Sequence, residues 1–285
     1  MNAVEVSGLQ KAYDGVEAVR GIDFELRTGE VFGLLGPNGA GKTTTVEILE
    51  GYRQRDAGDV RVLGVDPERD GRDWRARIGV VPQEGELFPT LTVLEHLRLF
   101  AGYYDRARPV DEVVRLVGLE EKAESKVRTL SGGQKRRLDL GVALIGDPEL
   151  IFLDEPTTGF DPGARRAAWQ TIRNLRALGK TILLTTHYIE EAQQLADRVA
   201  VLRRGEIVAS GTPADLIAGA ASTVVSFRRN GEEVVIETEE PTRVLHELTS
   251  QALQNGHELV GLEVHRPTLE EIYLSLTEDQ ETRPE

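Results

Sequence analysis

The 285-residue sequence contains no cysteine, which excludes a disulfide scaffold and a thiol nucleophile and fits a reducing compartment. Its first residues, Met1–Glu5, lack the basic and apolar regions of a signal peptide. No apolar run approaches the roughly 18 residues that are needed to span a bilayer. Any membrane role is therefore expected to come through a partner.

Positive charge is scarce, above all in the C-terminal part. The chain has 34 basic and 48 acidic residues, a net charge of −14, and residues 222–285 alone hold 14 acidic and 5 basic residues. This excess argues against a nucleic-acid surface there, and it is also what a solvated face needs to stay soluble. The 40% hydrophobic and 29% charged residues are typical of a soluble globular protein.

Short apolar runs alternate with helical patterns over the first two hundred residues. We expect buried strands at Val31–Leu35, Leu150–Leu153 and Thr181–Leu184, and helices at Lys42–Glu50, Val93–Tyr103, Val110–Val117, Ser131–Ile145 and Pro162–Leu178. Strands that alternate with helices predict an α/β fold with a mostly parallel sheet covered on both faces. Ligands on such sheets gather at the carboxyl ends of the strands, where this chain carries a lysine loop, an acidic pair and a histidine.

The pattern changes after residue 211, and Gly219-Ala-Ala-Ser222 reads as a linker. Beyond it we expect a small α/β domain over 222–276 and a disordered polar tail over 277–285. Its elements are strands at Thr223–Arg228, Glu233–Thr238 and near Leu259–Val264, a hairpin turn at Gly231, and helices at Pro241–Leu253 and Pro267–Leu276.

A glycine-rich loop joins the first buried strand to a helix. It reads Gly36, Pro37, Asn38, Gly39, Ala40, Gly41, Lys42, Thr43 and Thr44, a GxxxxGK[ST] pattern whose backbone N–H groups can close around a polyphosphate. Lys42 can bridge the β- and γ-phosphates, and the Thr43 hydroxyl can bind Mg²⁺. The alternative, a chance glycine-rich turn, does not explain the full pattern between a strand and a helix.

Two carboxylates, Asp154 and Glu155, end the second buried strand. Asp154 is placed to hold Mg²⁺, and Glu155 to polarise the water that attacks the γ-phosphate. A plain helix cap is the alternative for a single aspartate.

Three further side chains gain meaning from their position in the motif order. His187 follows the third buried strand and can donate to a γ-phosphate oxygen. Gln83 follows Ile78–Pro82, and its amide could touch Mg²⁺ or the attacking water. Tyr13 has a flat face suited to stacking on adenine, with a buried core tyrosine as the alternative.

A second glycine-rich turn has no lysine of its own. In Leu130-Ser131-Gly132-Gly133-Gln134, the serine can cap a helix while the glycines expose N–H groups to an anion. An ordinary capped helix is the simpler reading. If the turn does bind phosphate, a second chain is expected to supply the rest of that site.

In this order the motifs resemble those of the ATP-binding subunit of ABC transporters, over roughly residues 4–217. The resemblance implies that Tyr13 stacks on adenine, that 38–44 is the Walker A loop and that Gln83 is the Q-loop residue. It implies that Ser131–Gln134 is the signature motif. It also implies that Asp154 is the Walker B aspartate, Glu155 the catalytic glutamate and His187 the switch histidine. Asp161 belongs to the D-loop, where Gly159-Phe160-Asp161 departs from the usual Gly-Leu-Asp only by a larger apolar residue.

The resemblance also implies a fold and partners. It implies a P-loop NTPase domain at 1–218 with an antiparallel β subdomain and a helical subdomain at about 84–146. ATP and Mg²⁺ are the implied cofactors. Two subunits pack head to tail, each signature capping the other's ATP, and both act on a separate integral-membrane permease at the cytoplasmic face of the membrane. One copy of each motif makes a homodimer the economical expectation, and a heterodimer with a related ATPase stays open.

The segment Gly261–Leu274 resembles the ending of ATPases from ABC-2 type exporters, including the daunorubicin-resistance type. This implies export of a drug, antibiotic or lipid-like substrate, while the segment itself could be a docking surface or simply a capping helix. Two alternatives are an importer ATPase and a soluble ABC ATPase that acts on ribosomes or DNA. The second kind usually carries two cassettes or a long coiled-coil insertion, and this chain has neither.

Overall fold

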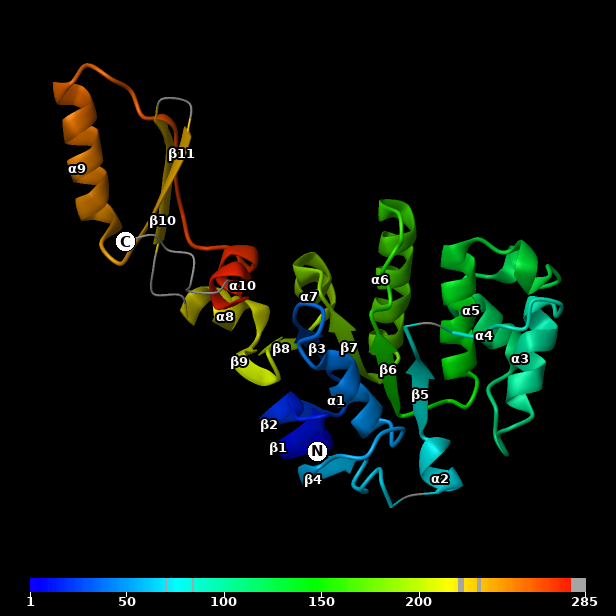
Figure 1. Cartoon of the computed structure of the whole chain (residues 1–285). Coiled ribbons are helices and arrows are strands. Elements are labelled where there is room, and N and C mark those ends of the chain that lie inside the picture. Colours follow the sequence, from blue (N-terminus) through cyan, green and yellow to red (C-terminus); the bar gives the residue numbers. More distant parts are fainter. Residues whose placement is uncertain (70, 84, 220–222, 230–231, 278–285) are drawn as a thin grey trace. The chain divides into compact units, whose positions relative to one another are not determined.

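The computed structural model describes residues 1–69, 71–83, 85–219, 223–229 and 232–277 (Figure 1). The linker residues 220–222, the turn at Gly231 and, beyond Thr277, the expected disordered tail lie outside this description. The chain forms two compact units, the first Met1–Ser210 and the second beginning at Gly211. Helix α8 (Pro213–Gly219), which the expected boundary at residue 218 assigns to the first domain, belongs to the second unit and packs against α10 (Leu269–Thr277).

A six-stranded sheet forms the centre of the first unit, in the order β5-β6-β7-β3-β8-β9. The pairs β5–β6, β6–β7, β7–β3 and β3–β8 are all parallel, as the sequence predicts. The strands are β3 (Val31–Leu35), β5 (Ile78–Val81), β6 (Leu150–Asp154), β7 (Thr181–Thr186), β8 (Arg198–Arg203) and β9 (Glu206–Gly211).

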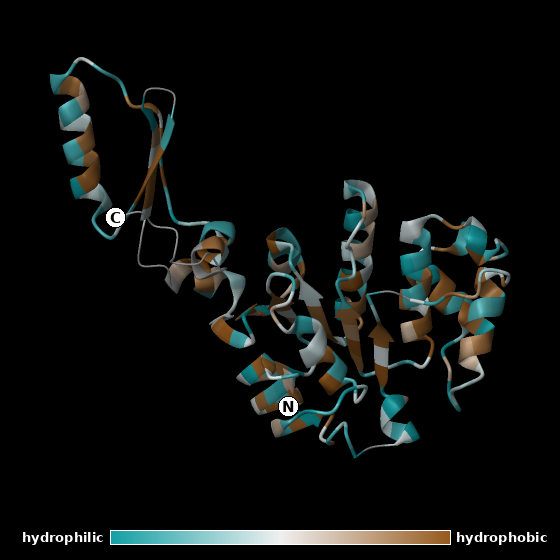
Figure 2. Cartoon of the chain, viewed as in Figure 1, coloured by the Kyte–Doolittle hydropathy of each residue, from teal (hydrophilic) through white to brown (hydrophobic). Residues whose placement is uncertain are grey.

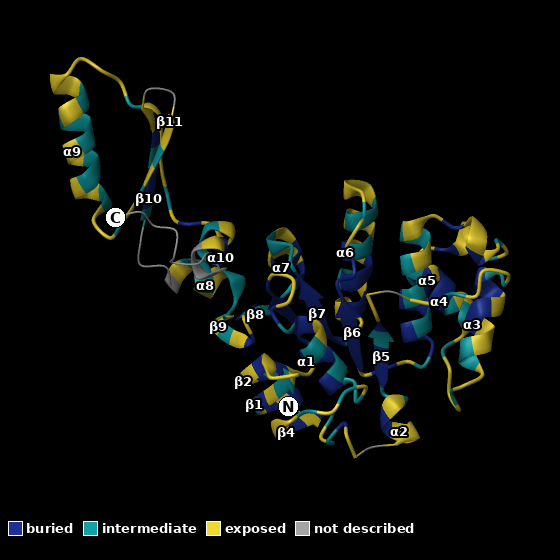
Figure 3. Ribbon diagram, in the orientation of Figure 1, coloured by how far each residue is buried: buried dark blue, intermediate teal, exposed yellow. Residues whose placement is uncertain are grey.

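Both faces of this sheet are buried, and every residue of β3, β6 and β7 is buried, most of them apolar (Figures 2 and 3). Alternate residues of β6 enter two different cores: Ile151 and Leu153 one, Leu150 and Phe152 the other. Fully buried strands need continuous apolar runs, which is why β3, β6 and β7 are the strands that the sequence reveals best.

One face is covered by helices. The first core cluster joins residues of α3 (Val93–Ala101), α4 (Val110–Leu116), α5 (Gly132–Leu144), α6 (Pro162–Ala177) and α7 (Ile189–Leu195) to the sheet. Helices α3, α4 and α5 contact one another and form the helical subdomain, with two 3-10 turns at Glu120–Lys122 and Val127–Thr129. Capping boxes begin α3 at Thr92 and α5 at Ser131.

The opposite face is covered by an antiparallel sheet and a helix. The strands β1 (Asn2–Tyr13), β2 (Val16–Arg27) and β4 (Ala57–Val62) pair in the order β2-β1-β4. Together with α1 (Lys42–Leu49) they build the second core cluster. This cluster also contains Trp74 of the short helix α2 (Arg72–Arg75). The indole N–H of Trp74 donates to the Val62 carbonyl at 3.0 Å.

The second unit holds an antiparallel sheet of its own, in the order β11-β10-β12. Its strands are β10 (Thr223–Arg229), β11 (Glu232–Thr238) and β12 (Val260–His265), with α9 (Pro241–Gln254) beside β10. Among the described residues of either unit, no helix combines the length and apolarity needed to cross a membrane.

Candidate functional site

The phosphate loop lies between the backbones of two other strands. A Cβ atom on Gly36 would come within 2.4 Å of the Leu202 carbonyl oxygen, and one on Gly41 within 2.3 Å of the Ala18 carbonyl oxygen. Gly41 also has a left-handed φ of +104°. Only glycine fits these two positions, so the loop is held in shape by packing, with the first turn of α1 directly behind it.

The side chain of Lys42 is folded back over this loop and is 4% exposed. Its Nζ donates to the carbonyls of Gly36 at 2.8 Å and Pro37 at 3.1 Å, and it lies 3.3 Å from Oε1 of Glu155. The structure therefore brings Lys42, which follows β3, together with Glu155, which follows β6, across the end of the intervening strand β7. A buried ammonium in this place is a strong anion site.

The carboxyl end of β6 is organised by a residue that the sequence reading did not single out. The buried hydroxyl of Thr185, on β7, donates to Oδ1 of Asp154 at 2.5 Å and accepts from the Glu155 N–H at 3.0 Å. One side chain thus orients both members of the acidic pair. Its position two residues before His187 is the only sequence signal that points to it.

Glu155 is 9% exposed and adopts a left-handed backbone with φ of +44°, which is uncommon for a residue other than glycine. Its Oε2 accepts from the Thr158 hydroxyl at 3.0 Å. Burial raises the pKa of Glu155, but the Lys42 ammonium, the Thr158 hydroxyl and His187 together bring that pKa below its ordinary value. The carboxylate is therefore charged at neutral pH and can accept a hydrogen bond from water.

His187 lies on the other side of Glu155. Its Nδ1 is 3.3 Å from Oε2 of Glu155, and it makes no hydrogen bond of good geometry to a described residue. The ring packs on Tyr188 with a centroid distance of 4.1 Å. A partly exposed imidazole held in this way has a nitrogen available to a ligand.

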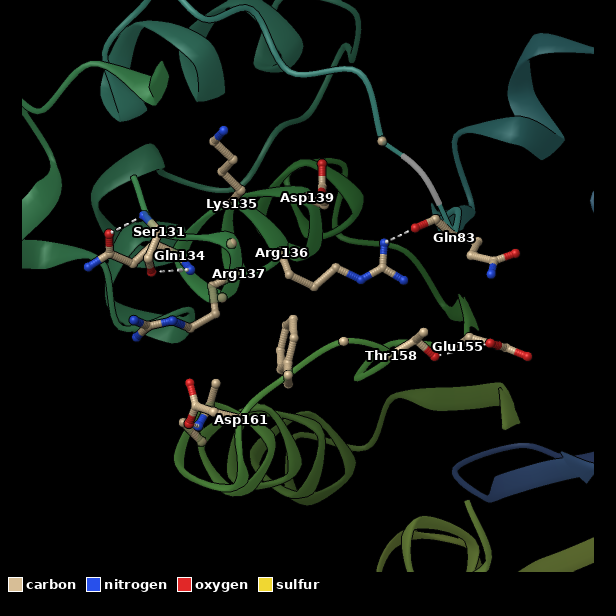
Figure 4. Close-up of a pocket in the computed structure, with 17 residues that line it drawn as sticks. Gln83, Ser131, Gln134, Lys135, Arg136, Arg137, Asp139, Glu155, Thr158 and Asp161 are labelled. Atoms are coloured by element: carbon tan, nitrogen blue, oxygen red, sulfur yellow. Dashed lines mark hydrogen bonds between the residues drawn. The ribbon is translucent and has the colours of Figure 1, made fainter. Parts of the chain in front are cut away.

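A cavity of about 600 Å³ next to this cluster extends from the glycine-rich turn to Glu155. Its lining includes Gln83, all four residues 131–134, Glu155 and Asp161 (Figure 4). Ser131 and Gln134 exchange two hydrogen bonds, in which the serine oxygen accepts from the Gln134 N–H at 3.3 Å. The hydroxyl hydrogen of Ser131 thus remains a donor. Among the described residues that line this cavity, none comes from the phosphate loop 36–44.

Two of the predicted residues are seen in other roles. Asp161 caps α6, because its Oδ1 accepts from the N–H groups of Gly163 at 2.8 Å and Ala164 at 2.9 Å. Tyr13 is not a buried core tyrosine: it is 36% exposed at the end of β1, with Lys11 and Arg53 over its ring at 5.5 and 5.1 Å. The exposure of the ring is compatible with stacking on a base.

The residues expected to hold Mg²⁺ supply the oxygen ligands that this ion prefers. The Thr43 hydroxyl and the Gln83 amide are exposed, and the Asp154 carboxylate is 6% exposed. A divalent cation would also relieve the repulsion that the Asp154 charge exerts on a nearby carboxyl, Glu50 at the end of α1. The donor set therefore fits Mg²⁺.

Glu50 provides a stability prediction. Burial first, then the charges of Asp154 and Glu47, raise its pKa to about 8. An acid with a raised folded-state pKa contributes stability that is full below its unfolded pKa, about 4.5, and that is lost as the pH rises through about 8. We expect Glu50→Gln to become more stable relative to the native chain between pH 5 and 8.5, by at most about 1.4 kcal/mol for each pH unit. Thermal unfolding curves at pH 5, 7 and 8.5 test this, and a constant difference in Tm between the two proteins would contradict it.

Comparison with known sequences agrees with this geometry. Residues 19–158 match the ABC transporter family. The chain is 47% identical over 221 residues to the Nod factor export ATP-binding protein I of Paraburkholderia xenovorans (strain LB400), a match covering 76% of this chain and 73% of that one. It is 34% identical over 304 residues to the linearmycin resistance ATP-binding protein LnrL of Bacillus subtilis (strain 168), covering 96% of this chain and 98% of that one.

Solved structures agree as well. The chain matches an ATP-binding subunit of an ABC transporter with a TM-score of 0.71 and 26% identity, over 97% of this chain and 100% of that one. It matches a dimeric ATP-binding cassette in a post-hydrolysis state, bound to ADP and Pi, with a TM-score of 0.66 and 27% identity, over 73% and 98%. The expected fold, a P-loop ATPase with antiparallel β and helical parts, is confirmed. The chain therefore belongs to the ATP-hydrolysing subunits of the ABC transporter family, among those of the ABC-2 type exporters.

Proposed function

We propose that this ATPase hydrolyses ATP at the cluster of Lys42, Glu155 and His187 and thereby powers export through a separate membrane subunit. The observation that carries the proposal is the contact of the Glu155 carboxylate with both Lys42 and His187, at 3.3 Å each. Lys42 leaves its loop carbonyls to neutralise the β- and γ-phosphates, Glu155 orients the attacking water, and His187 donates to a γ-phosphate oxygen. Phosphoryl transfer needs positioning and charge neutralisation more than covalent chemistry, and this cluster supplies both.

The remaining site residues take supporting roles in the proposal. Residues 36–44 hold the phosphates, Tyr13 stacks on the adenine, and Asp161 lies beside the nucleotide. Thr43, Asp154 and Gln83 are the residues that would hold Mg²⁺, which would neutralise phosphate charge when it is bound. Asp154 is held for this purpose by the Thr185 hydroxyl.

The signature turn Ser131–Gln134 is proposed to serve the ATP of a second subunit. ABC ATPases act as dimers together with membrane permease subunits, and a homodimer is the simplest assembly for a chain with one copy of each motif. We propose that the chain works at the cytoplasmic face of the cell membrane, without nucleic acid, and that the exported substrate is a drug, antibiotic or lipid-like amphiphile. The likeness to a linearmycin resistance protein over 96% of the chain supports this substrate class.

Transport in vesicles tests the direction and the partner. The tagged chain is expressed with the membrane protein that copurifies with it, and uptake of a fluorescent amphiphile is measured in inside-out and right-side-out vesicles. We expect ATP-dependent uptake in inside-out vesicles and none when the Glu155→Gln chain replaces the native one. Uptake only in right-side-out vesicles supplied with internal ATP would indicate an importer. Copurification with ribosomes in place of a membrane protein would reject a transport function.

A further inference from the structure

One arginine of the signature helix reaches out of the helical subdomain to the central sheet. Arg136 lies in the second turn of α5, and its side chain extends toward Gln83 (Figure 4). Its guanidinium donates to backbone carbonyls at the ends of two strands: Nη2 to Asp154 at 2.7 Å, Nε to Pro156 at 3.3 Å, and Nη1 to Pro82 and to Gln83, the latter at 3.4 Å. A planar fork of donors suits this task in a way that a lysine ammonium does not.

The carbonyls that Arg136 binds stand on both sides of Glu155. Asp154 precedes the glutamate and Pro156 follows it, and the glutamate itself has the uncommon φ of +44°. A strained backbone persists only where its surroundings hold it in place. Here Arg136 holds the flanking carbonyls, while the Thr185 hydroxyl accepts from the Glu155 N–H.

The same guanidinium connects this backbone to the loop that follows β5. Besides the carbonyls of Pro82 and Gln83, this loop contacts α5 at Gly85, where a Cβ atom would come within 2.6 Å of Oδ1 of Asp139. Burial lowers the pKa of Arg136, while the charges of Asp139, Asp154 and Glu191 favour its cationic form. A partly buried cation bound to four carbonyl groups is expensive to remove, because those acceptors would lose their donor.

We infer that Arg136 is a positioning residue for hydrolysis: it fixes the backbone on both sides of Glu155 and ties it to the Gln83 loop and to the helix that begins at Ser131. Arg136 thus connects the signature turn Ser131–Gln134, which is proposed to contact the ATP of the second subunit, to the Glu155 carboxylate, which is proposed to act on the ATP of its own subunit. The inference rests on the proposed catalytic role of Glu155.

The test compares steady-state ATP hydrolysis and ATP binding in the full-length chain. Arg136→Met keeps an unbranched apolar stem but is shorter and loses every donor. We expect its kcat to fall at least about tenfold, because a small misplacement of a reacting group is costly, while KM and the Kd for ATP change less than about threefold. Arg136→Lys keeps the charge but offers fewer donors, so its kcat should lie between those of the native chain and Arg136→Met. Arg115→Met, which removes an arginine bound to the Asp111 carbonyl of its own helix, should keep its activity.

A second measurement separates positioning from a loss of folding. Thr185→Val removes the other support of the same backbone. Because both residues act on one segment, their effects should not be independent: the fold reduction of kcat in the Thr185→Val/Arg136→Met double variant should be smaller than the product of the fold reductions in the two single variants. A folded Arg136→Met protein with kcat within twofold of native would overturn the inference, and so would a loss that only follows the fraction of unfolded protein. Full activity of Glu155→Gln, measured alongside, would instead reject the proposed function on which the inference depends.

Discussion

Replacing Glu155 by glutamine is expected to leave ATP binding intact and to reduce ATP hydrolysis at least about a hundredfold, the size typical of losing a positioned base or a preorganised electrostatic group. The amide keeps the shape of the side chain and its contact to the Thr158 hydroxyl, but it is neutral and a much weaker acceptor for the proton of water. Lys42 retains its own contacts to the loop carbonyls, so the phosphate site remains.

The measurement is turnover under saturating Mg-ATP, together with the Kd for ATP and the oligomeric state by gel filtration. In the proposed dimer, bound ATP holds the two subunits together until it is hydrolysed. The variant no longer hydrolyses it and should therefore elute as a dimer in the presence of ATP, whereas the native chain hydrolyses its ATP and the dimer opens again. Glu149→Gln is the matched control: it changes a carboxylate at the opposite end of β6, where it pairs with Arg77 at 2.6 Å. Native turnover in Glu155→Gln would remove this residue from the mechanism.

The parts of the fold that the sequence predicts well are those with an uninterrupted physical signal. The runs Val31–Leu35 and Leu150–Leu153 are buried on both faces, so every residue is apolar, and the observed strands agree within one residue. The helices α3, α5 and α6 begin at capping side chains, Thr92, Ser131 and Asp161, that mark their first turns. The rule that ligands gather at the carboxyl ends of parallel strands then brings Lys42, Glu155 and His187 together correctly.

The parts that the sequence does not reveal depend on long-range contacts. The strand β1 pairs with β2 through several register shifts, so its buried residues do not alternate regularly, whereas Ile22, Phe24 and Leu26 of β2 do alternate as a half-buried strand should. Thr185 and Arg136 bind groups that lie far from them along the chain, and no local pattern distinguishes them from an ordinary buried threonine or a surface arginine. The packing of α8 is equally hidden from the sequence, because its partner α10 lies about fifty residues further along the chain.

The second large effect concerns the shared site. In the described part of the chain, the cavity that contains Ser131–Gln134 is lined by Glu155 and Asp161 but not by the phosphate loop, and the hydroxyl of Ser131 keeps its hydrogen as a donor. A turn of this kind can contact a phosphate without enclosing it. If it serves the ATP of a second subunit, a defect in Lys42 and a defect in Ser131 each spoil both sites of a dimer built from identical chains.

Mixing two inactive chains should therefore restore activity. Lys42→Ala removes the charge that holds the phosphates, and Ser131→Arg places a bulky cation where the anion would lie. In a dimer with one chain of each kind, one site carries both defects and the other carries neither. Random pairing makes about half of the dimers mixed, each with one intact site of two, so equal mixing should recover up to about a quarter of native turnover.

Thr92→Arg serves as the control for the loss of a helix cap, because Thr92 and Ser131 begin their helices with the same kind of capping box. Losing either cap costs about 1 kcal/mol of stability, so turnover that survives in Thr92→Arg and vanishes in Ser131→Arg traces the defect to the site. Each chain carries a different affinity tag, and tandem purification confirms that mixed dimers have formed. Recovery in these mixed dimers requires that Lys42 of one chain and Ser131 of the other act on the same ATP. Mixed dimers without any turnover would mean that both residues serve a site within one chain, and the two-subunit site would have to be abandoned.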